Sequence, residues 1–215
     1  MCGRATLTVS VDDIRDVFEV DEVPPLPPRF NIAPSQPVAA VRLNAQGERE
    51  SVAMKWGIVP RHNPKQLIIN ARAETAATGV FKTSFARRRC AIPADGWYEF
   101  EDSGGKKLPW LYAFGNHAPF LFAGMWESGV DAYGSAIDCC TIVTVPANDL
   151  AAKVHDRMPA ILDDDAVAPW LGGEPDTATL KSFLKPFPSE RLTARRVSPL
   201  VNNWRNEGPE LLAPS

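Results

Sequence analysis

The chain has 215 residues, of which 45% are hydrophobic and 23% are charged. This composition excludes a disordered or collagen-like chain and is typical of one globular domain with a sizeable core. The formal net charge of −3 argues against a general electrostatic grip on nucleic acid, so any anion site must be a local basic groove. The 20 prolines predict many ordered loops and relatively little helix.

The N-terminal stretch and the cysteines indicate the compartment. Asp12 and Asp13 interrupt the first apolar segment, which excludes a secretory signal, and no run approaches the roughly 18 apolar residues of a membrane span. The cysteines form no C-x-x-C pair and have no histidine at zinc-finger spacing: they are Cys2, Cys90, Cys139 and Cys140. We therefore expect a cytoplasmic, reduced protein that needs no metal and no cofactor.

The N-terminal part of the chain is predicted to contain a strand, a helix and an ordered loop. Ala5–Val9 favours a strand. Ser10 or Asp12 can cap the helix that follows, and four apolar residues share one of its faces: Val11, Ile14, Val17 and Phe18. The proline-rich segment Pro24–Pro37 is interpreted as a loop that wraps the main domain, because too few residues precede it to form a core.

From Val38 onward the pattern favours strands with short connections. Val38–Leu43 and Glu50–Trp56 flank a turn and predict a hairpin. Cys90–Glu101 and Leu108–Phe114 flank Ser-Gly-Gly-Lys-Lys and predict another. The further strands expected are Leu67–Asn70, Phe120–Trp126, Ile137–Val145 and Leu192–Val197. The helices expected are Ala71–Ala77, Phe81–Arg88, Asn148–Val154, Asp163–Leu171 and Thr177–Leu184. This order is too strand-rich for βαβ units, so we predict a single α+β domain, residues 1–215, around a largely antiparallel, barrel-like sheet.

Cys2 offers a specific chemistry once Met1 is removed, which is sterically easy before a small residue. The α-amine then lies beside the thiol, and its pKa of about 7.7–8.0, against about 10.4 for lysine, leaves far more of it neutral near neutral pH. A neutral amine attacks an aldehyde to give a Schiff base, and the thiol can close onto the imine carbon as a five-membered ring. An N-terminal cysteine is thus an aldehyde trap, although by position alone such a residue is more often incidental.

Six sequence blocks carry a resemblance to a known family. They are MCGR at the start, NIAPSQ at Asn31–Gln36, WGIVP at Trp56–Pro60, INARAET at Ile69–Thr75, AIPADGWYEF at Ala91–Phe100 and HDRMP at His155–Pro159. In these blocks, and more weakly in VSPLVNN near the C-terminus, the chain resembles the SOS-response-associated peptidase (SRAP) family of abasic-site processing proteins. Six blocks in the family's order are much more specific than any single motif.

The resemblance implies a reaction and its residues. The N-terminal cysteine of such proteins crosslinks to the ring-opened aldehyde of an abasic site in single-stranded DNA, and the thiazolidine product shields the lesion. Carried over, Cys2 is the nucleophile and Asn70 lies beside the sugar-derived hydroxyl. Glu99 is the proton shuttle, and His155 is the acid and base near the leaving oxygen.

The same resemblance sets the expected activity and partners. We expect a lyase-type DNA crosslinking protein of the SOS response and DNA repair, with an autopeptidase activity that removes Met1. Its partners are single-stranded DNA containing abasic sites and proteins of the replication fork. We expect a monomer that associates with the nucleoid when it is bound to DNA.

Each catalytic assignment has a check from the residues and a plainer competitor. Alternation puts Trp97 and Glu99 on one strand face, where an aromatic surrounding would raise the pKa of the carboxyl; the alternative is a solvated glutamate. His155 precedes Asp156 and could be oriented by it; the alternative is a surface histidine. Asn70 ends an apolar strand and could project into a site, or could merely cap the next helix.

The residues expected to contact DNA lie near the catalytic positions in the sequence, and several of them are basic. Arg4 and Arg72 are natural phosphate clamps, and Glu74 could orient Arg72 or the amine. The other expected DNA contacts are Gly3, Asn31, Pro34, Arg61, His62 and Arg157. The run Arg87–Arg89 is more typical of a solvated face than of a DNA site.

The chain departs from the family pattern after WGIVP. Many relatives place bulky aromatic residues there, which wedge against the bases beside the lesion. This sequence has Arg61, His62 and Asn63. The departure leaves the crosslinking residues intact and concerns the geometry at a DNA junction.

Two other functions use some of the same features. An N-terminal-nucleophile hydrolase or amidotransferase would use Cys2 to attack an amide, with its own amine as base; the other motifs do not follow that pattern. A noncatalytic single-stranded DNA-binding protein would not need Cys2, and the net charge and the absence of interleaved basic and aromatic runs argue against it. Hydrolysis of glutamine or of a peptide would identify the first.

Overall fold

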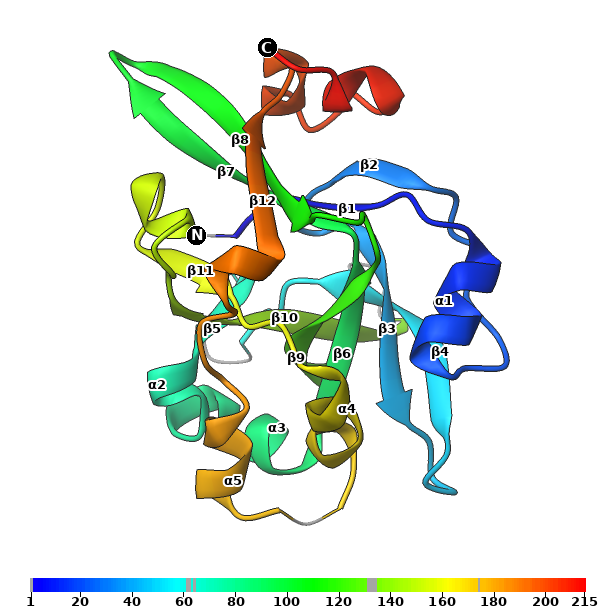
Figure 1. Cartoon of the computed structure of the whole chain (residues 1–215). Coiled ribbons are helices and arrows are strands. Elements are labelled where there is room, and N and C mark those ends of the chain that lie inside the picture. The colour runs from blue at the N-terminus through cyan, green and yellow to red at the C-terminus, as the bar shows by residue number, and fades with distance from the viewer. Residues whose placement is uncertain (1, 61–62, 64, 131–134, 174) are drawn as a thin grey trace.

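Twelve strands in the described residues of a computed structural model form two sheets; the described residues are 2–60, 63, 65–130, 135–173 and 175–215. The smaller sheet is antiparallel throughout. Its order is β12 (Leu192–Arg196), β8 (Lys106–Phe114), β7 (Gly96–Ser103), β1 (Ala5–Leu7) and β2 (Arg29–Ile32). The β7–β8 hairpin projects from one end of the molecule, and the C-terminal segment packs beside it (Figure 1).

The larger sheet closes on itself. Its path runs through β11 (Arg157–Pro159), β10 (Ala136–Pro146), β4 (Arg49–Trp56), β3 (Pro37–Leu43), β6 (Arg89–Ala94) and β9 (Phe120–Val130). Because β9 also pairs with β10, five of these strands form a closed ring, and β5 (Asn70–Arg72) adds to β10 in parallel. Closure leaves those five strands without a free edge. The prediction of an α+β domain with a barrel-like sheet is confirmed.

Short helices surround the sheets. They are α1 (Val11–Phe18), α2 (Ala73–Ala76), α3 (Lys82–Arg87), α4 (Asp164–Leu171) and α5 (Thr177–Ser182). Five 3₁₀ turns occur in the described residues: η1 (Gly79–Phe81), η2 (Ala151–Lys153), η3 (Ser189–Arg191), η4 (Pro199–Asn202) and η5 (Pro209–Leu212). Ser10 caps α1 in a capping box with Asp13. No helix in the described part of the chain is long and apolar enough to cross a membrane.

The strand β7 separates two cores. Trp97 belongs to the large core, whereas Tyr98 lies in a small one with Leu111 and the C-terminal segment. The predicted alternation along β7 is therefore confirmed. Glu99 is only 2% exposed, so the alternative of a solvated strand glutamate is wrong.

Both predicted hairpins are confirmed. Cys90, Cys139 and Cys140 are free and buried. The predicted strand Cys90–Glu101 is two strands in different sheets, separated at Asp95. The Asp95 carboxylate accepts hydrogen bonds from Thr6, Thr8 and Val9, which hold β1 against the point where the chain crosses between the sheets.

Other predicted boundaries of strands and loops were wrong because pairing with a distant strand decides where a strand forms. The loop Pro24–Pro37 contains β2, which forms because β1 offers it a partner. The expected strand Leu67–Asn70 begins at Asn70 instead, because β10 pairs with Asn70–Arg72. The three residues of β11 carried no strand pattern and pair only with the end of β10. On α1, Ile14 and Phe18 are buried, but Val11 and Val17 are exposed.

Candidate active site

Cys2 is held by the strand that follows it. Ala5 pairs with Trp97 on β7, and the Tyr98 amide donates to the Arg4 carbonyl at 3.0 Å. The Cys2 side chain is completely buried, and its carbonyl accepts a hydrogen bond from Asn70 Nδ2 at 2.7 Å. Position 70 therefore contacts the residue expected to be the nucleophile. The alternative that Asn70 caps α2 is wrong, because Arg72 occupies that cap position and no side-chain bond is made there.

Glu99 and Cys2 interact electrostatically. Burial raises the pKa of the Glu99 carboxyl to about 7, and the negative charge of Asp156 raises it as well. Burial also raises the pKa of the Cys2 thiol, with the charge of Glu99 as the next contribution. Near neutral pH the thiol therefore keeps its proton, whereas the carboxyl can both give and take one.

His155 lies in the loop between η2 and β11. Its Nδ1 accepts the Arg157 backbone N–H at 3.0 Å, and Asp156 Oδ1 lies 2.9 Å from the same nitrogen. Burial lowers the pKa of the His155 ring, so the neutral form is favoured. Because Nδ1 accepts the Arg157 N–H, the proton of the neutral ring is on Nε2. When the ring gains a second proton on Nδ1, the Asp156 carboxylate becomes its ion-pair partner.

Arg157 is buried and forms a bidentate ion pair with Glu74. Its Nη1 lies 2.5 Å from Oε1 and its Nη2 lies 3.0 Å from Oε2, and Nη2 also donates to the Thr144 carbonyl. These hydrogen bonds lower the pKa of Glu74. The sequence suggested that Glu74 orients Arg72 or the amine; in the structure its hydrogen-bond partner is Arg157, and Arg72 is exposed at the end of β5.

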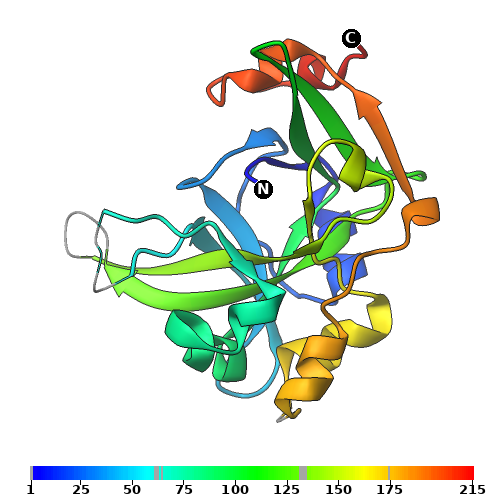
Figure 2. The same cartoon turned by 90° about the vertical axis from the view of Figure 1, so that its left-hand side faces the viewer.

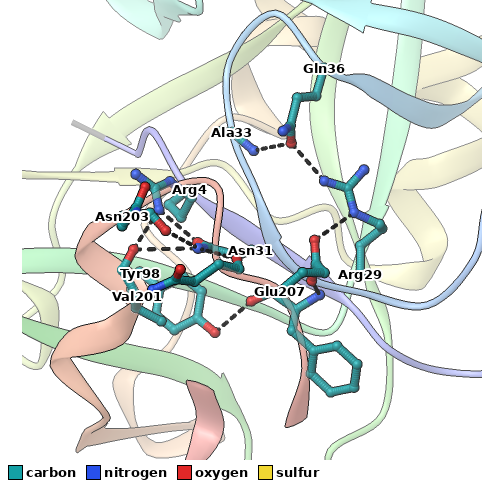
Figure 3. A network of polar contacts seen from close by, with 11 residues as sticks. Arg4, Arg29, Asn31, Ala33, Gln36, Tyr98, Val201, Asn203 and Glu207 are labelled. Carbon is teal, nitrogen blue, oxygen red and sulfur yellow. Dashed lines mark hydrogen bonds and ion pairs between the residues drawn. The ribbon is translucent and has the colours of Figure 1, made fainter. Parts of the chain in front are cut away.

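Arg4 and Asn31 belong to an internal network with the C-terminal segment (Figure 3). Arg4 Nη1 donates to Asn31 Oδ1 at 2.6 Å and to the Val201 carbonyl at 2.7 Å. Asn31 is completely buried, and its Nδ2 donates to the carbonyls of Asn203 at 3.1 Å and Asn206 at 2.9 Å. These side chains hold the strand that carries Cys2 against the C-terminal segment, a contact that the sequence reasoning missed; the VSPLVNN block was its only signal.

Two of the remaining expected DNA contacts, Gly3 and Pro34, belong to the described residues. Gly3 is half-buried beside Cys2, and Pro34 lies in the turn between β2 and β3. Arg61 and His62 lie outside the described residues.

The arginine run Arg87–Arg89, from the end of α3 to the start of β6, is not a uniform basic face. Arg89 is buried against backbone carbonyls of Phe85, Ala86 and Trp170. Arg88 pairs with Glu127, and Arg87 is exposed. Among the residues that the structure describes, no three His, Cys, Asp or Glu side chains gather in a way that could hold a metal ion.

Figure 2 looks onto the face where these elements meet: the N-terminus lies near its centre, the yellow loop that precedes β11 lies beside it, and the C-terminal segment lies above. Cys2, Asn70 and Glu99 are brought together from the segment before β1, from β5 and from β7. His155 joins them through Asp156, whose charge acts on Glu99. The arrangement combines a thiol, an amide, a carboxyl that can exchange protons near neutral pH and an imidazole whose neutral form is favoured.

Comparisons with known proteins agree with this fold and identify the family of the chain. The family model described as SOS response associated peptidase (SRAP) matches residues 1–204. The chain belongs to the SRAP family. It is 36% identical over 222 residues to the abasic site processing protein YoqW of Bacillus subtilis, with 99% of each chain covered. It is 29% identical to the abasic site processing protein YedK of Escherichia coli, with 100% of each chain covered.

Solved structures show the same fold. A protein from Bacteroides thetaiotaomicron matches with a TM-score of 0.87 at 19% identity, with 100% of both chains covered. A protein from Bordetella bronchiseptica matches with a TM-score of 0.78 at 30% identity, with 92% of this chain and 100% of that chain covered. The first of these shares the fold at an identity too low to say more.

Proposed function

We propose that this protein processes abasic sites in DNA by forming a thiazolidine crosslink between Cys2 and the ring-opened aldehyde in single-stranded DNA. The observation that carries this proposal is the surroundings of the buried Cys2. Asn70 donates a hydrogen bond to the Cys2 carbonyl, and the Glu99 carboxyl, with a pKa of about 7, is close enough for its charge to act on the Cys2 thiol. The names of the relatives, abasic site processing proteins, support the substrate.

The reaction requires removal of Met1 and then two bond-forming steps. The free α-amine of Cys2 adds to the aldehyde carbon and one water leaves, which gives an imine. The Cys2 S–H then adds across the C=N bond, sulfur to carbon and hydrogen to nitrogen, which closes the five-membered ring. No electrons are gained or lost overall. Because the two reactive groups belong to one residue, ring closure is intramolecular and benefits from a high effective concentration.

Glu99 and His155 supply the proton transfers in this proposal. Glu99 takes the proton of the attacking amine and returns it to the hydroxyl that leaves as water. It then takes the proton of the thiol, which the raised pKa of that group requires a base to remove, and passes it to the ring nitrogen. His155 Nε2 donates to the sugar oxygen when the ring of the abasic site opens. Asn70 fixes the backbone of the nucleophile and orients the sugar-derived hydroxyl.

The wider proposal follows from the same reaction. Because the imine forms by elimination of water and the thiol then adds to its double bond, with no hydrolysis or oxidation in the crosslinking itself, we class that activity as lyase type. Self-removal of Met1, a hydrolysis, is a separate peptidase step. We propose that the protein acts as a monomer on single-stranded DNA near replication forks. Arg72 and the backbone at Gly3 are the phosphate contacts nearest to Cys2, whereas Arg4 and Arg157 act mainly by holding Asn31 and Glu74.

The test mixes purified protein with a single-stranded oligonucleotide that contains one abasic aldehyde. We expect a band that resists denaturation and borohydride, with the mass of protein plus DNA minus one water, and only from chains that have lost Met1. Cys2→Ala should abolish this product, whereas Cys139→Ala, which removes a buried strand cysteine, should keep it.

An undiminished ring adduct from Cys2→Ala would contradict the mechanism. Release of ammonia from glutamine, or cleavage of a peptide, without any DNA adduct would support an N-terminal-nucleophile hydrolase instead.

A further inference from the structure

An aromatic side chain is presented to solvent beside the strand that carries Cys2. Trp204 is 46% exposed and is the only aromatic residue among the large exposed hydrophobic side chains of the described part of the chain. Leu200, in the preceding turn η4, is 52% exposed. The guanidinium of Arg205 lies over the Trp204 ring, 4.5 Å from its centroid. One face of the indole therefore already has a cation stacked on it.

The loop that carries Trp204 is held by hydrogen bonds, two of which come from the buried side chain of Asn31. The Asn31 amide donates to the carbonyls of Asn203 and Asn206, immediately before and two residues after the tryptophan. Asn206 Nδ2 donates to the Leu200 carbonyl at 2.9 Å. Because the backbone is fixed before any ligand arrives, binding through Trp204 would cost little ordering entropy.

The same network sets the position of Trp204 relative to the candidate active site. Arg4 contacts both Asn31 and the Val201 carbonyl (Figure 3). Arg4 is two positions along the chain from Cys2, a span of at most about 7 Å. Figure 2 shows the C-terminal segment and the N-terminus on one face. A strand whose lesion lies at Cys2 would need only a few nucleotides to reach the loop.

We propose that Trp204, with Arg205 behind it, is a stacking platform for a nucleobase of the DNA strand that is bound at Cys2. The identity of that strand rests on the proposed function. An exposed indole stacks on any base through its π face. The guanidinium on the opposite face makes a cation–π contact with the ring and adds a positive charge that attracts the phosphates. The platform recognises unpaired bases without sequence preference and favours single strands, because bases in a duplex are already stacked on their neighbours.

The test measures noncovalent binding, so that it does not depend on the crosslinking chemistry. The probe is a fluorescent single-stranded oligonucleotide with a tetrahydrofuran abasic analogue, which has no aldehyde, and a second probe replaces the bases on both sides by base-free spacers. We expect Trp204→Ala to raise the Kd for the first probe by about tenfold, within the range for loss of one base stack, and to leave the Kd for the base-free probe unchanged. Trp204→Phe should retain most of the binding.

A matched control removes an exposed apolar side chain elsewhere. Val17 is 52% exposed and belongs to α1, the helix that lies on the other side of the molecule from the N-terminus in Figure 1. Val17→Ala should bind both probes like the wild type. Equal binding of the first probe by wild type and Trp204→Ala would overturn the inference, and so would an equal loss on both probes.

If the wild type forms no adduct with aldehyde DNA, the proposed function fails, while this binding assay still decides the role of Trp204.

Discussion

Replacement of Glu99 by glutamine should make the protein more stable and less active. The folded-state pKa of about 7 lies above the ordinary value of 4.5, so the folded protein holds the Glu99 proton more tightly than the unfolded chain does. Its contribution to stability is therefore complete below about pH 4.5 and is lost as the pH rises through about 7. The difference between the two pKa values corresponds to about 3 kcal/mol.

Glutamine has nearly the same shape and no charge, so it removes that pH-dependent loss. At about pH 8 we expect Glu99→Gln to raise the free energy of unfolding by about 3 kcal/mol relative to wild type, and at about pH 4 we expect the two proteins to be nearly equal. The melting temperature should rise by about 6–12 °C at the higher pH. The assay is thermal and urea unfolding of chains with the same N-terminus at both pH values.

The activity of the same variant should change in the opposite direction. Loss of a positioned base typically slows a reaction by about 10²–10⁴-fold. In the wild type, the crosslinking rate should rise through about pH 7 as Glu99 loses its proton; in Glu99→Gln only the rise from the α-amine, near pH 8, should remain.

The control is Glu101→Gln, two residues further along β7, where a hydrogen bond from Trp110 lowers the pKa of the carboxyl. It should show neither effect. Equal pH dependence of stability in wild type and Glu99→Gln would refute the reasoning.

The other predictions concern the groups around Cys2. Asn70→Ala should slow crosslinking by about tenfold without changing its pH profile, because it removes the hydrogen bond to the Cys2 carbonyl; an unchanged rate in a time course would contradict this. His155→Ala should slow both formation and reversal of the adduct by about 10²–10⁴-fold. Formation is measured by trapping the adduct and reversal by a chase with competitor DNA, and normal rates in both directions would remove His155 from the mechanism. Arg157→Lys should lower the free energy of unfolding by about 1–3 kcal/mol, because lysine cannot replace the bidentate contact with Glu74. Urea unfolding measures this change, and an unchanged midpoint would show that the pair does not stabilise the fold.

Local patterns in the sequence determined most of the elements. The two hairpins follow from turn residues between apolar runs, and the start of α1 follows from the Ser10 cap, since each depends on residues only a few positions apart. The side-chain alternation along β7 likewise placed Glu99 on the face of Trp97. The motif order predicted the family before any contact was known, and with it Cys2 as the residue to examine.

Contacts between distant segments were decided only by the tertiary structure. Closure of the barrel by β9 and β10, the split of one apolar run at Asp95 and the short strand β11 depend on which partner each segment finds, and no local pattern carries that information. The roles of charged residues were equally nonlocal. Arg4 reads as a phosphate clamp in the sequence, but its guanidinium binds Asn31 and the Val201 carbonyl, because a partly buried arginine is stabilised by whichever acceptors the fold brings to it.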